Sequence, residues 1–310
     1  MAIYLTNDDV RGLMSMGECV EVLDDLFRQE AVGLVENIPR QRRRFAGGGS
    51  ATLMGGAVLG SKAYGVRNSN HSLLYDTDSG RLEAVIEPSY VARTRTGGAS
   101  GVATRYMATP DASVVGCVGT GRQAGAQLQA MCAVRPISLI KLYSRNSEHR
   151  EAFAVEMAAV LGVEVRAVGS TEECIGGSSI VIAMTNSSVP VFDGALLEPG
   201  THVNAAGANS YARREIDETT IVRASVVAVD NIAQAMTECG ELIAAVDRGA
   251  FRWREAVDLH EVVSGKTSGR PTPEAITLFE SQGIGIEDVA CYQYAVRKAL
   301  DLGVGQELPF

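Results

Sequence analysis

The feature that most constrains the fold is a regular alternation of short apolar strands with helices, which begins near residue 113. We expect helices at 123–134 and 148–161, and strands at 113–118, 138–143, 163–168, 179–184, 202–206 and 225–230. Apolar strands of this kind are buried on both faces, and the helices between them return the chain so that successive strands run parallel. This part of the chain therefore predicts an α/β domain built on a doubly wound parallel sheet.

A glycine-rich turn follows the first of these strands. It has the spacing G-x-G-x-x-A, and its residues are Gly119, Thr120, Gly121, Arg122, Gln123 and Ala124. The first glycine permits a tight turn, the second lets the backbone approach a pyrophosphate, and the alanine allows close packing of helix on strand. Free amides at the start of the next helix then bind phosphate. The turn predicts a Rossmann dinucleotide-binding domain; a turn without a ligand is the alternative.

The end of the second strand distinguishes the two nicotinamide cofactors. An acidic residue there would bind the ribose 2′-hydroxyl of NAD(H). This chain has Ser144, Arg145 and Asn146 instead. A hydroxyl and a guanidinium suit a 2′-phosphate, which favours NADP(H). NAD(H) is the alternative, in which Arg145 is a solvated arginine that stacks on adenine.

The ends of two later strands carry further candidates for the cofactor site. Thr185, Asn186 and Ser187 follow the strand at 179–184, and Gly207 follows the strand at 202–206. Ligands of a doubly wound sheet bind beyond the carboxyl ends of its strands. We therefore expect these residues near the cofactor, with Thr185 close to the nicotinamide ribose.

The first third of the chain has a different pattern. Apolar residues at helical spacing predict one amphipathic helix that begins at a Thr6 cap and extends to Phe27. From Ile38 to Glu87 the pattern is strand-like, and 76–80 is expected to close a hairpin. A helix of unusually small residues is expected at 90–107. These elements predict a separate α+β unit.

Two basic residues of this unit are candidates for binding an anion. Lys62 lies in an apolar, strand-like stretch, where a lysine normally keeps its charge only beside an anionic partner. Arg95 lies in the small-residue helix, where its guanidinium could hold a carboxylate with two hydrogen bonds. For either residue alone, a surface salt bridge is the simpler interpretation.

Taken together, several ordered segments resemble the ornithine cyclodeaminase and mu-crystallin family. They are RTGGAS at 95–100, GTGRQA at 119–124, PGTHVNAAGA at 199–208, REID at 214–217, and ITLF at 276–279 with EDV at 287–289. The resemblance extends over essentially the whole chain from about Ile38, and these ordered matches are together much more specific than the glycine turn alone.

The resemblance implies a homodimer in which a Rossmann domain at 112–287 is inserted into a substrate-binding and dimerisation domain at 1–111 and 288–310. It also implies an amino-acid or imino-acid substrate whose α-carboxylate is held by Arg40, Lys62 and Arg95. Lys62 could in addition act as acid or base near the substrate nitrogen, because a lysine in a partly dry site shifts its pKa readily.

One position departs from the cyclodeaminase pattern. Members that carry out cyclodeamination have an Asp after the Gly-Ala of the 199–208 segment, whereas this chain has Asn209. An amide cannot take up a proton, so the leading hypothesis is NAD(P)H-dependent reduction of a 2-imino acid to an amino acid, or the reverse dehydrogenation. Asn209 would then hydrogen-bond the nitrogen or a water. A deaminating lyase that uses bound NAD, and a non-catalytic ligand-binding protein, are the alternatives.

Other residues bear on which substrate is bound. Arg40, Arg42 and Arg44 would share one face of a strand, so the substrate could carry a second carboxylate; a solvated basic face is the alternative. His71 could be a further substrate contact, although a single histidine in a loop is more often structural.

Composition argues against several other classes of protein. The formal charge of −9 provides no basic footprint for nucleic acid. Six widely spaced cysteines predict reduced core residues and no metal site. The start of the chain has no targeting pattern, and no apolar run is long enough to span a bilayer, so we expect a cytoplasmic protein without membrane contact.

Overall fold

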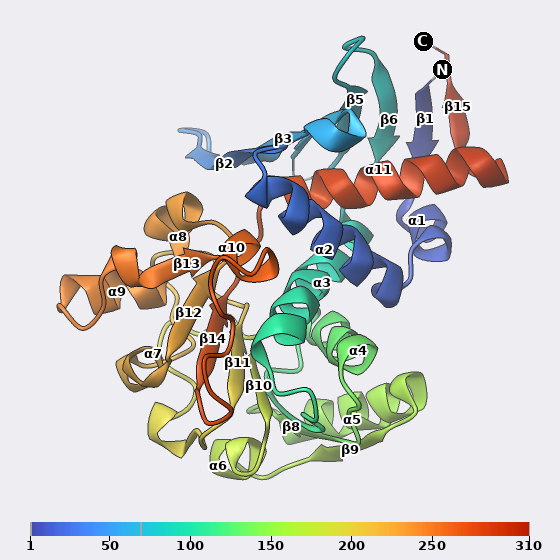
Figure 1. Ribbon diagram of the computed structural model, residues 1–310. Helices are drawn as coiled ribbons and strands as arrows, with labels where there is room; N and C mark the ends of the chain where they lie inside the picture. Colours follow the sequence, from blue (N-terminus) through green and yellow to red (C-terminus); the bar gives the residue numbers. More distant parts are fainter. Residues whose placement is uncertain (1, 69, 310) are drawn as a thin grey trace. The chain divides into compact units, whose positions relative to one another are not determined.

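The computed structural model describes residues 2–68 and 70–309, and it divides into two compact units (Figure 1). Unit 1 comprises Met1–Gly98 and Gly283–Phe310, and unit 2 comprises Ala99–Gln282. The long helix α3 (Ser89–Met107), predicted at 90–107, passes from the first unit into the second. The domain division predicted from the sequence stays a prediction. Within the described residues, no helix combines the length and apolar character needed to cross a membrane.

Unit 1 contains a seven-stranded sheet in the order β15-β1-β6-β5-β4-β3-β2. The strands are β1 (Ala2–Leu5), β2 (Val35–Arg44), β3 (Ser50–Val58), β4 (Ala63–Arg67), β5 (Ser72–Asp76), β6 (Leu82–Ile86) and β15 (Gln306–Leu308). Strands β2 to β6 form an antiparallel meander, which includes the predicted β5–β6 hairpin. The strand β1 joins parallel to β6, and β15 pairs antiparallel with β1; neither strand was predicted.

The single amphipathic helix predicted near the N-terminus is in fact two helices. Helix α1 (Asn7–Leu13) begins at the expected Thr6 cap, whose hydroxyl accepts from the amide of Asp9. Helix α2 (Met16–Ala31) has a second capping box, formed by Ser15 and Glu18. The prediction of one helix was wrong because the apolar spacing continues across a break that the Ser15 cap creates.

The C-terminal helix α11 (Gly285–Leu302) packs closely on the sheet of unit 1 because glycines face each other there. A Cβ atom added to Gly285 would lie 2.4 Å from the backbone nitrogen of Gly55, and one on Gly56 would lie 2.5 Å from the side chain of Ile286. Such contacts tolerate no side chain. They bring the acidic first turn of α11, with Glu287 and Asp288, against the strands.

Unit 2 contains an all-parallel, eight-stranded sheet in the order β13-β12-β14-β11-β10-β7-β8-β9 (Figure 1). Its strands are β7 (Val114–Val118), β8 (Leu139–Tyr143), β9 (Glu164–Ala167), β10 (Ile180–Ala183), β11 (His202–Ala205), β12 (Val226–Val229), β13 (Ala256–Asp258) and β14 (Thr277–Glu280). The six strands predicted from the sequence are all present, and the predicted doubly wound α/β fold is confirmed. Helices lie on both faces: α4 (Ala124–Val134), α5 (Ser147–Leu161), α6 (Thr171–Ile175), α7 (Glu218–Arg223), α8 (Ile232–Glu238), α9 (Gly240–Asp247) and α10 (Leu259–Val263).

The register of this sheet brings the carboxyl ends of its central strands to one level. Ala183 of β10 pairs with Val118 of β7 on one side and with Ala205 of β11 on the other. The last strand of the unit, β14, is inserted between β11 and β12, so that its Glu280 pairs with Ala205 and with Val229. The segments that follow these strands therefore lie side by side at one edge.

The six cysteines are free, as predicted; Cys132 is half-buried and the other five are buried. Burial raises the pKa of the thiols that lie deepest, Cys117 and Cys239 among them. Thiols of this kind are unreactive core residues.

Candidate active site

The glycine turn after β7 has the backbone that its motif predicts. Gly119 has a φ of +112°, and a Cβ atom there would lie 2.2 Å from the carbonyl oxygen of Met184. A Cβ atom on Gly121, by contrast, would meet no protein atom within 4 Å. Ala124 is fully buried at the start of α4. The turn is therefore tight on the side of β10 and open above Gly121, which fits a bound pyrophosphate.

The residues after β8 form a second turn beside the first. The Thr120 hydroxyl donates to the hydroxyl of Ser144 at 3.0 Å and lies 3.0 Å from Nδ1 of His149. Asn146 is the N-cap of α5, where its side chain accepts from the amide of His149. Arg145 is exposed. His149 was not predicted as a site residue; it lies in the first turn of α5, next to the predicted Ser144–Asn146 segment.

A buried glutamate joins the ends of β10 and β11. Glu215 is fully buried, and its carboxylate accepts hydrogen bonds from the amides of Thr185 and Gly207. Thr185 and Ser187 are half-buried, with the Ser187 amide donating to the Thr185 hydroxyl at 3.1 Å, whereas Asn186 is exposed. The predicted Thr185–Ser187 and Gly207 segments thus do lie together, as neighbouring strand ends require.

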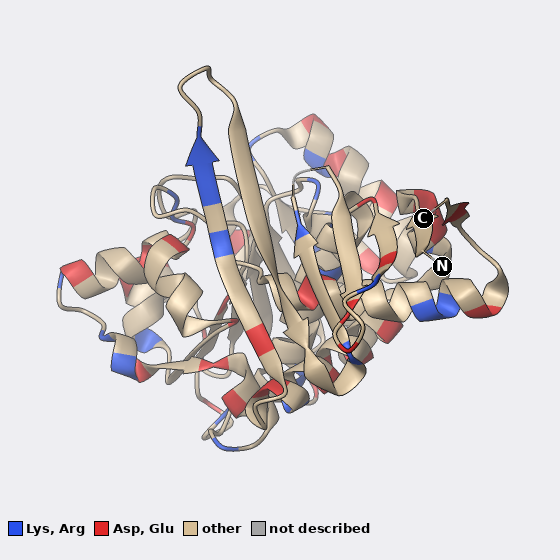
Figure 2. Cartoon of the chain, turned by 90° about the horizontal axis from the view of Figure 1, so that it is seen from above, with Lys and Arg blue, Asp and Glu red and all other residues tan. Residues whose placement is uncertain are grey.

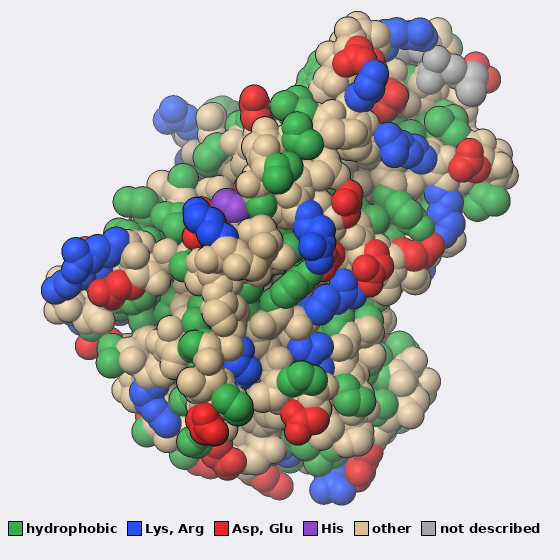
Figure 3. Space-filling view, viewed as in Figure 1, with side chains coloured by type: hydrophobic (Ala, Val, Ile, Leu, Met, Phe, Trp, Pro, Cys, Tyr) green, Lys and Arg blue, Asp and Glu red, His purple; other side chains and the backbone are tan. Residues whose placement is uncertain are grey.

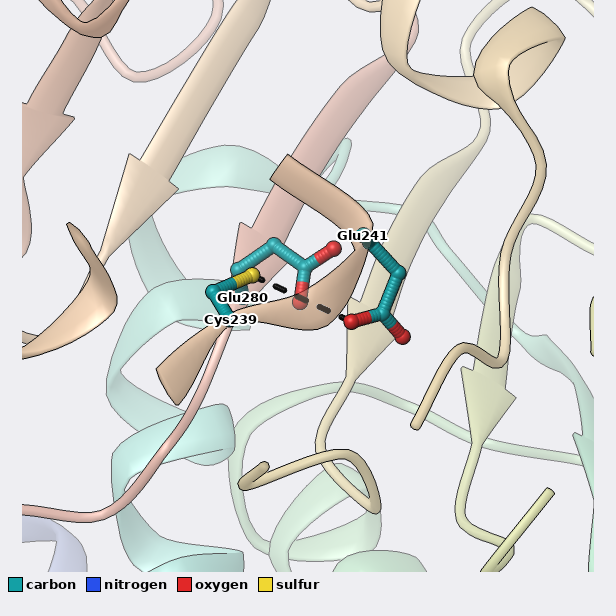
Figure 4. Close-up of side chains that lie close together, drawn as sticks. All are labelled: Cys239, Glu241 and Glu280. Carbon is teal, nitrogen blue, oxygen red and sulfur yellow. Dashed lines mark hydrogen bonds between the residues drawn. The ribbon is translucent and has the colours of Figure 1, made fainter. Parts of the chain in front are cut away.

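Two more glutamates and a thiol lie close to one another at this edge (Figure 4). The sulfur of Cys239, one carboxylate oxygen of Glu241 and one of Glu280 lie within 4.8 Å of one another. All three residues are buried. The Cys239 thiol lies 3.9 Å from a Glu241 oxygen, and Glu241 also accepts from the amide of Glu215 at 2.7 Å. A buried anion is costly in a medium of low dielectric constant.

Burial therefore shifts these acids toward their neutral forms. It raises the pKa of Glu215 to about 7 and that of Glu241 to about 7. It raises the pKa of Glu280 well above the usual range, and the neighbouring Glu241 and Glu215 charges add to that effect. At Glu215, hydrogen bonds from several backbone amides stabilise the ionised carboxylate and partly offset the effect of burial on its pKa. Glu280 therefore holds its proton more strongly than Glu215 does.

In unit 1, arginines from the sheet and from α3 converge on the first turn of α11. Arg95, only 4% exposed, donates to Glu287 at 2.8 Å and to Asp288 at 3.3 Å. Arg67 of β4 donates to both oxygens of Asp288, at 3.1 and 3.2 Å. Arg67 was not predicted as a site residue, although it is a cation at the end of a largely apolar strand and was therefore recognisable by the same signal as Lys62.

Arg40 belongs to the same group of arginines. Its guanidinium donates to the carbonyl oxygen of Gly283 at 2.7 Å. Gly283 has a φ of +72°, and a Cβ atom there would lie 2.2 Å from a guanidinium nitrogen of Arg95. We call Arg40, Arg67 and Arg95 the arginine cluster. It collects three guanidinium groups, from β2, β4 and α3, around the 283–288 segment.

A β-bulge separates Arg40 from the other arginines of β2. The register of β2 on β3 shifts between Ile38 and Gln41, after which Arg42 pairs with Thr52 and Arg44 with Ser50. Arg42 and Arg44 are exposed, and Figure 2 shows the basic residues gathered toward one end of this long strand. The simple alternation that would have placed all three on one face does not hold through the bulge.

Lys62 does not lie in the environment expected for it. It ends the 3₁₀ turn Leu59–Ser61 with a φ of 58°, outside any strand, and its side chain is 65% exposed. Its ammonium group lies 2.6 Å from Asp78, also exposed, and this partner raises the lysine pKa. The expectation of a strand position in a partly dry site was wrong, because β3 ends at Val58 and β4 begins only at Ala63, which leaves Lys62 in the exposed connection.

Two further predicted residues lie in loops. His71 is exposed in the turn between β4 and β5, where its amide donates to the side chain of Asn68 at 2.9 Å. Asn209 is half-buried in the segment after β11. On the surface seen in Figure 3, acidic and basic side chains are interspersed with apolar ones.

An all-parallel sheet with a glycine turn open above its second glycine defines a Rossmann-type nucleotide-binding protein. The model of the ornithine cyclodeaminase/mu-crystallin family matches residues 2–302. This chain belongs to that family.

Individual relatives indicate the chemistry. A Delta(1)-pyrroline-2-carboxylate reductase of Bacillus cereus is 35% identical over 242 residues, which cover 77% of this chain and 73% of the relative. The same enzyme of Thermococcus litoralis, solved in complex with NADH and L-proline, has a TM-score of 0.94 and 31% identity, covering 99% of this chain and 100% of that one. An archaeal alanine dehydrogenase dimer with bound NAD has a TM-score of 0.91 and 29% identity, covering 100% and 99%.

The fold, the glycine turn and these relatives together define the activity class. The chain is an NAD(P)-dependent oxidoreductase that acts on CH–NH or CH–NH₂ bonds. The predicted family and enzyme class are confirmed.

Alanine substitutions test the different roles of Gly119 and Gly121 in the glycine turn. Gly119→Ala should lower the melting temperature without cofactor, because the methyl group meets Met184 and the φ is unfavourable for alanine. Gly121→Ala should leave that temperature within about a degree of wild type, yet weaken NADH binding at least about tenfold, because its methyl group occupies the open space above the turn. Thermal unfolding measures the melting temperature of each variant, and fluorescence titration measures its affinity for NADH. Unchanged NADH affinity in Gly121→Ala would contradict this placement of the pyrophosphate.

The buried acids predict a pH dependence of stability. Because the pKa of Glu280 is raised on folding, the folded state retains a proton that the unfolded state releases above its ordinary pKa near 4.5. This contribution to stability is therefore full at low pH and declines as pH rises. Glu280→Gln should gain stability relative to wild type between pH 5 and pH 8, as measured by denaturant unfolding. A constant difference across that range would contradict a protonated Glu280.

Proposed function

We propose that the chain reduces a cyclic 2-imino acid of the Δ¹-pyrroline-2-carboxylate type to the corresponding amino acid with NAD(P)H. The observation that carries the proposal is the arginine cluster, in which Arg40, Arg67 and Arg95 bind the 283–288 segment at the start of α11. Guanidinium groups held by buried acids are oriented in advance, which suits them to bind a substrate carboxylate. The identity with reductases of this substrate class adds support.

The roles proposed for the other residues follow from their charge. Arg95 and Arg40 hold the substrate carboxylate, and Arg67 fixes Asp288, which in turn orients Arg95. Lys62, whose pKa is raised, remains an ammonium at neutral pH. It is therefore proposed as the proton donor to the imine nitrogen, not as a base. Asn209 hydrogen-bonds that nitrogen or a water, and His71 is a further candidate for contact with the substrate.

The cofactor is proposed to bind along the carboxyl edge of the sheet in unit 2. The turn from Gly119 through Ala124 (with Thr120, Arg122 and Gln123) holds the pyrophosphate, and the loop of Thr185, Asn186 and Ser187 together with Gly207 faces the nicotinamide ribose. When bound, the nicotinamide supplies a hydride to the imine carbon. The protein contributes position, charge and the proton that completes the amine.

We also propose that the chain forms a homodimer. Large apolar side chains are exposed on β2, on β3 and in the connections next to them, and they include Leu34, Ile38, Phe45 and Leu53. Exposed apolar side chains gathered in one region are typical of interfaces. The archaeal relative solved as a dimer supports the proposal, and sedimentation equilibrium at micromolar concentration tests it, since a monomer mass would contradict it.

The substrate proposal is tested by following absorbance at 340 nm. Purified protein with NADH or NADPH should oxidise the cofactor when Δ¹-pyrroline-2-carboxylate is added, and more slowly with acyclic 2-oxo acids plus ammonia or with dicarboxylic imines.

Arg95→Lys should raise KM for the imine at least about tenfold, because a lysine cannot bind the substrate carboxylate with two parallel hydrogen bonds. Arg42→Lys, on the exposed part of β2, is the matched control. Ammonia release from ornithine without any absorbance change would support the cyclodeaminase instead, and cofactor binding without turnover would support a binding protein.

The preference for NADP(H) is proposed from the second turn. Ser144 is fixed by Thr120, Arg145 is exposed, and no acid stands among Ser144, Arg145 and Asn146. Arg145→Glu should therefore lower kcat/KM with NADPH about tenfold or more while affecting NADH little, because it replaces a cation near the 2′-phosphate with an anion. Equal losses with the two cofactors, or a wild type that prefers NADH, would contradict the proposal.

A further inference from the structure

One buried carboxylate holds together the two segments that the proposed function places beside the nicotinamide ribose. Glu215 accepts from the amide of Gly207 at 2.6 Å and from the amide of Thr185. These amides belong to loops that leave adjacent strands, because β10 and β11 are paired up to Ala183 and Ala205. Hydrogen bonds from N–H groups to an ionised carboxylate are stronger than neutral ones.

The backbone around Glu215 is fixed on further sides. Its carbonyl oxygen accepts from the amide of Val191 at 2.8 Å, and the amide of Arg214 donates to Ser187 at 3.1 Å. Its own amide donates to Glu241 of α9 at 2.7 Å. The carboxylate therefore reaches the two loops from a segment that is itself held in place.

Gly207 shows how closely these groups approach. A Cβ atom at this position would lie 2.3 Å from the carbonyl oxygen of Thr185 and 2.4 Å from a carboxylate oxygen of Glu215. Glu215 is fully buried, and the other neighbour is backbone, so a side chain at this position would displace a loop. The glycine is needed to let the carboxylate bridge the two strand ends.

We propose that Glu215 is a positioning residue for the redox reaction: by binding the amides of Thr185 and Gly207 it fixes the two loops against which the nicotinamide ribose rests. This inference rests on the proposed cofactor site. Glu215 does not touch the reacting atoms. It acts through the loops, so its loss should weaken cofactor binding and turnover more than binding of the imine.

The ionised form of Glu215 is the one that can accept from both loops. Cys117 of β7, Glu241 of α9 and Glu280 of β14 interact electrostatically with Glu215, and Arg214 precedes it in the chain. Asp230 and Cys239 lie beyond these groups and interact with Glu280. The acids among them oppose a second negative charge, and burial raises the pKa of Glu215 to about 7. Protonation occupies one carboxyl oxygen and so weakens its contact with a loop amide. Cofactor affinity should therefore fall as pH is lowered through 7.

The test compares Glu215→Gln with wild type and with Glu218→Gln, a control in the first turn of α7 whose carboxylate lies 3.4 Å from Arg248 near the surface. NADH is the probe, because its pyrophosphate does not titrate near neutral pH. At pH 8, Glu215→Gln should raise Kd for NADH by about ten- to a hundredfold, the range expected for one lost charge-assisted hydrogen bond. It should also lower kcat, leave KM for the imine within about twofold, and remove the dependence of Kd on pH.

The wild-type protein provides a second measurement in case the variant fails to fold. Its Kd for NADH, titrated from pH 6 to pH 8.5, should fall as Glu215 ionises, whereas a flat profile would overturn the proposal. A folded Glu215→Gln with wild-type Kd and kcat would overturn it as well. If the wild type binds NADH but reduces no imine, the substrate proposal fails, while the Kd measurements still decide the role of Glu215.

Discussion

Close approach of backbone to backbone, possible only at glycine, is the constraint on which both units depend. In unit 2, Gly119 lies against Met184 and Gly207 against Thr185, so the loops after three adjacent strands meet without intervening side chains. In unit 1, Gly285 lies against Gly55, which seats the acidic first turn of α11 on the sheet. Charged groups lie next to these contacts: Glu215 beside Gly207 in unit 2, and Glu287 and Asp288 in the turn that begins at Gly285 in unit 1.

The two units keep their buried charges in different ways. In unit 1, Glu287 and Asp288 are neutralised by guanidinium groups, and the same contacts orient the arginines in advance for an anion. In unit 2, Glu215, Glu241 and Glu280 lie close together, and burial raises the pKa of each. Ion pairs give a site whose charge changes little with pH, whereas acids with raised pKa values make the loops at the sheet edge sensitive to pH.

Single residues illustrate how far sequence patterns reach. The Thr6 cap, the β5–β6 hairpin and the turn at Gly119 were all predicted, because each depends on residues close in the chain. The environment of Lys62 was predicted wrongly, since an apolar neighbourhood in sequence is not burial in space. The partners of Arg95 lie 192 and 193 residues away, and no local pattern can indicate them.

The sequence by itself determined the alternation of strands and helices, the glycine turn and hence the nucleotide-binding class, because backbone conformation and hydrophobic periodicity are local properties. Only the tertiary structure decided that β14 enters the sheet between β11 and β12, that Arg67 joins Arg40 and Arg95, and that Glu215 bridges Thr185 and Gly207. These are pairings between segments far apart in the chain. They depend on which surfaces pack together and on which groups pair with a buried charge. No single stretch of sequence determines either one, because the groups involved come from distant segments.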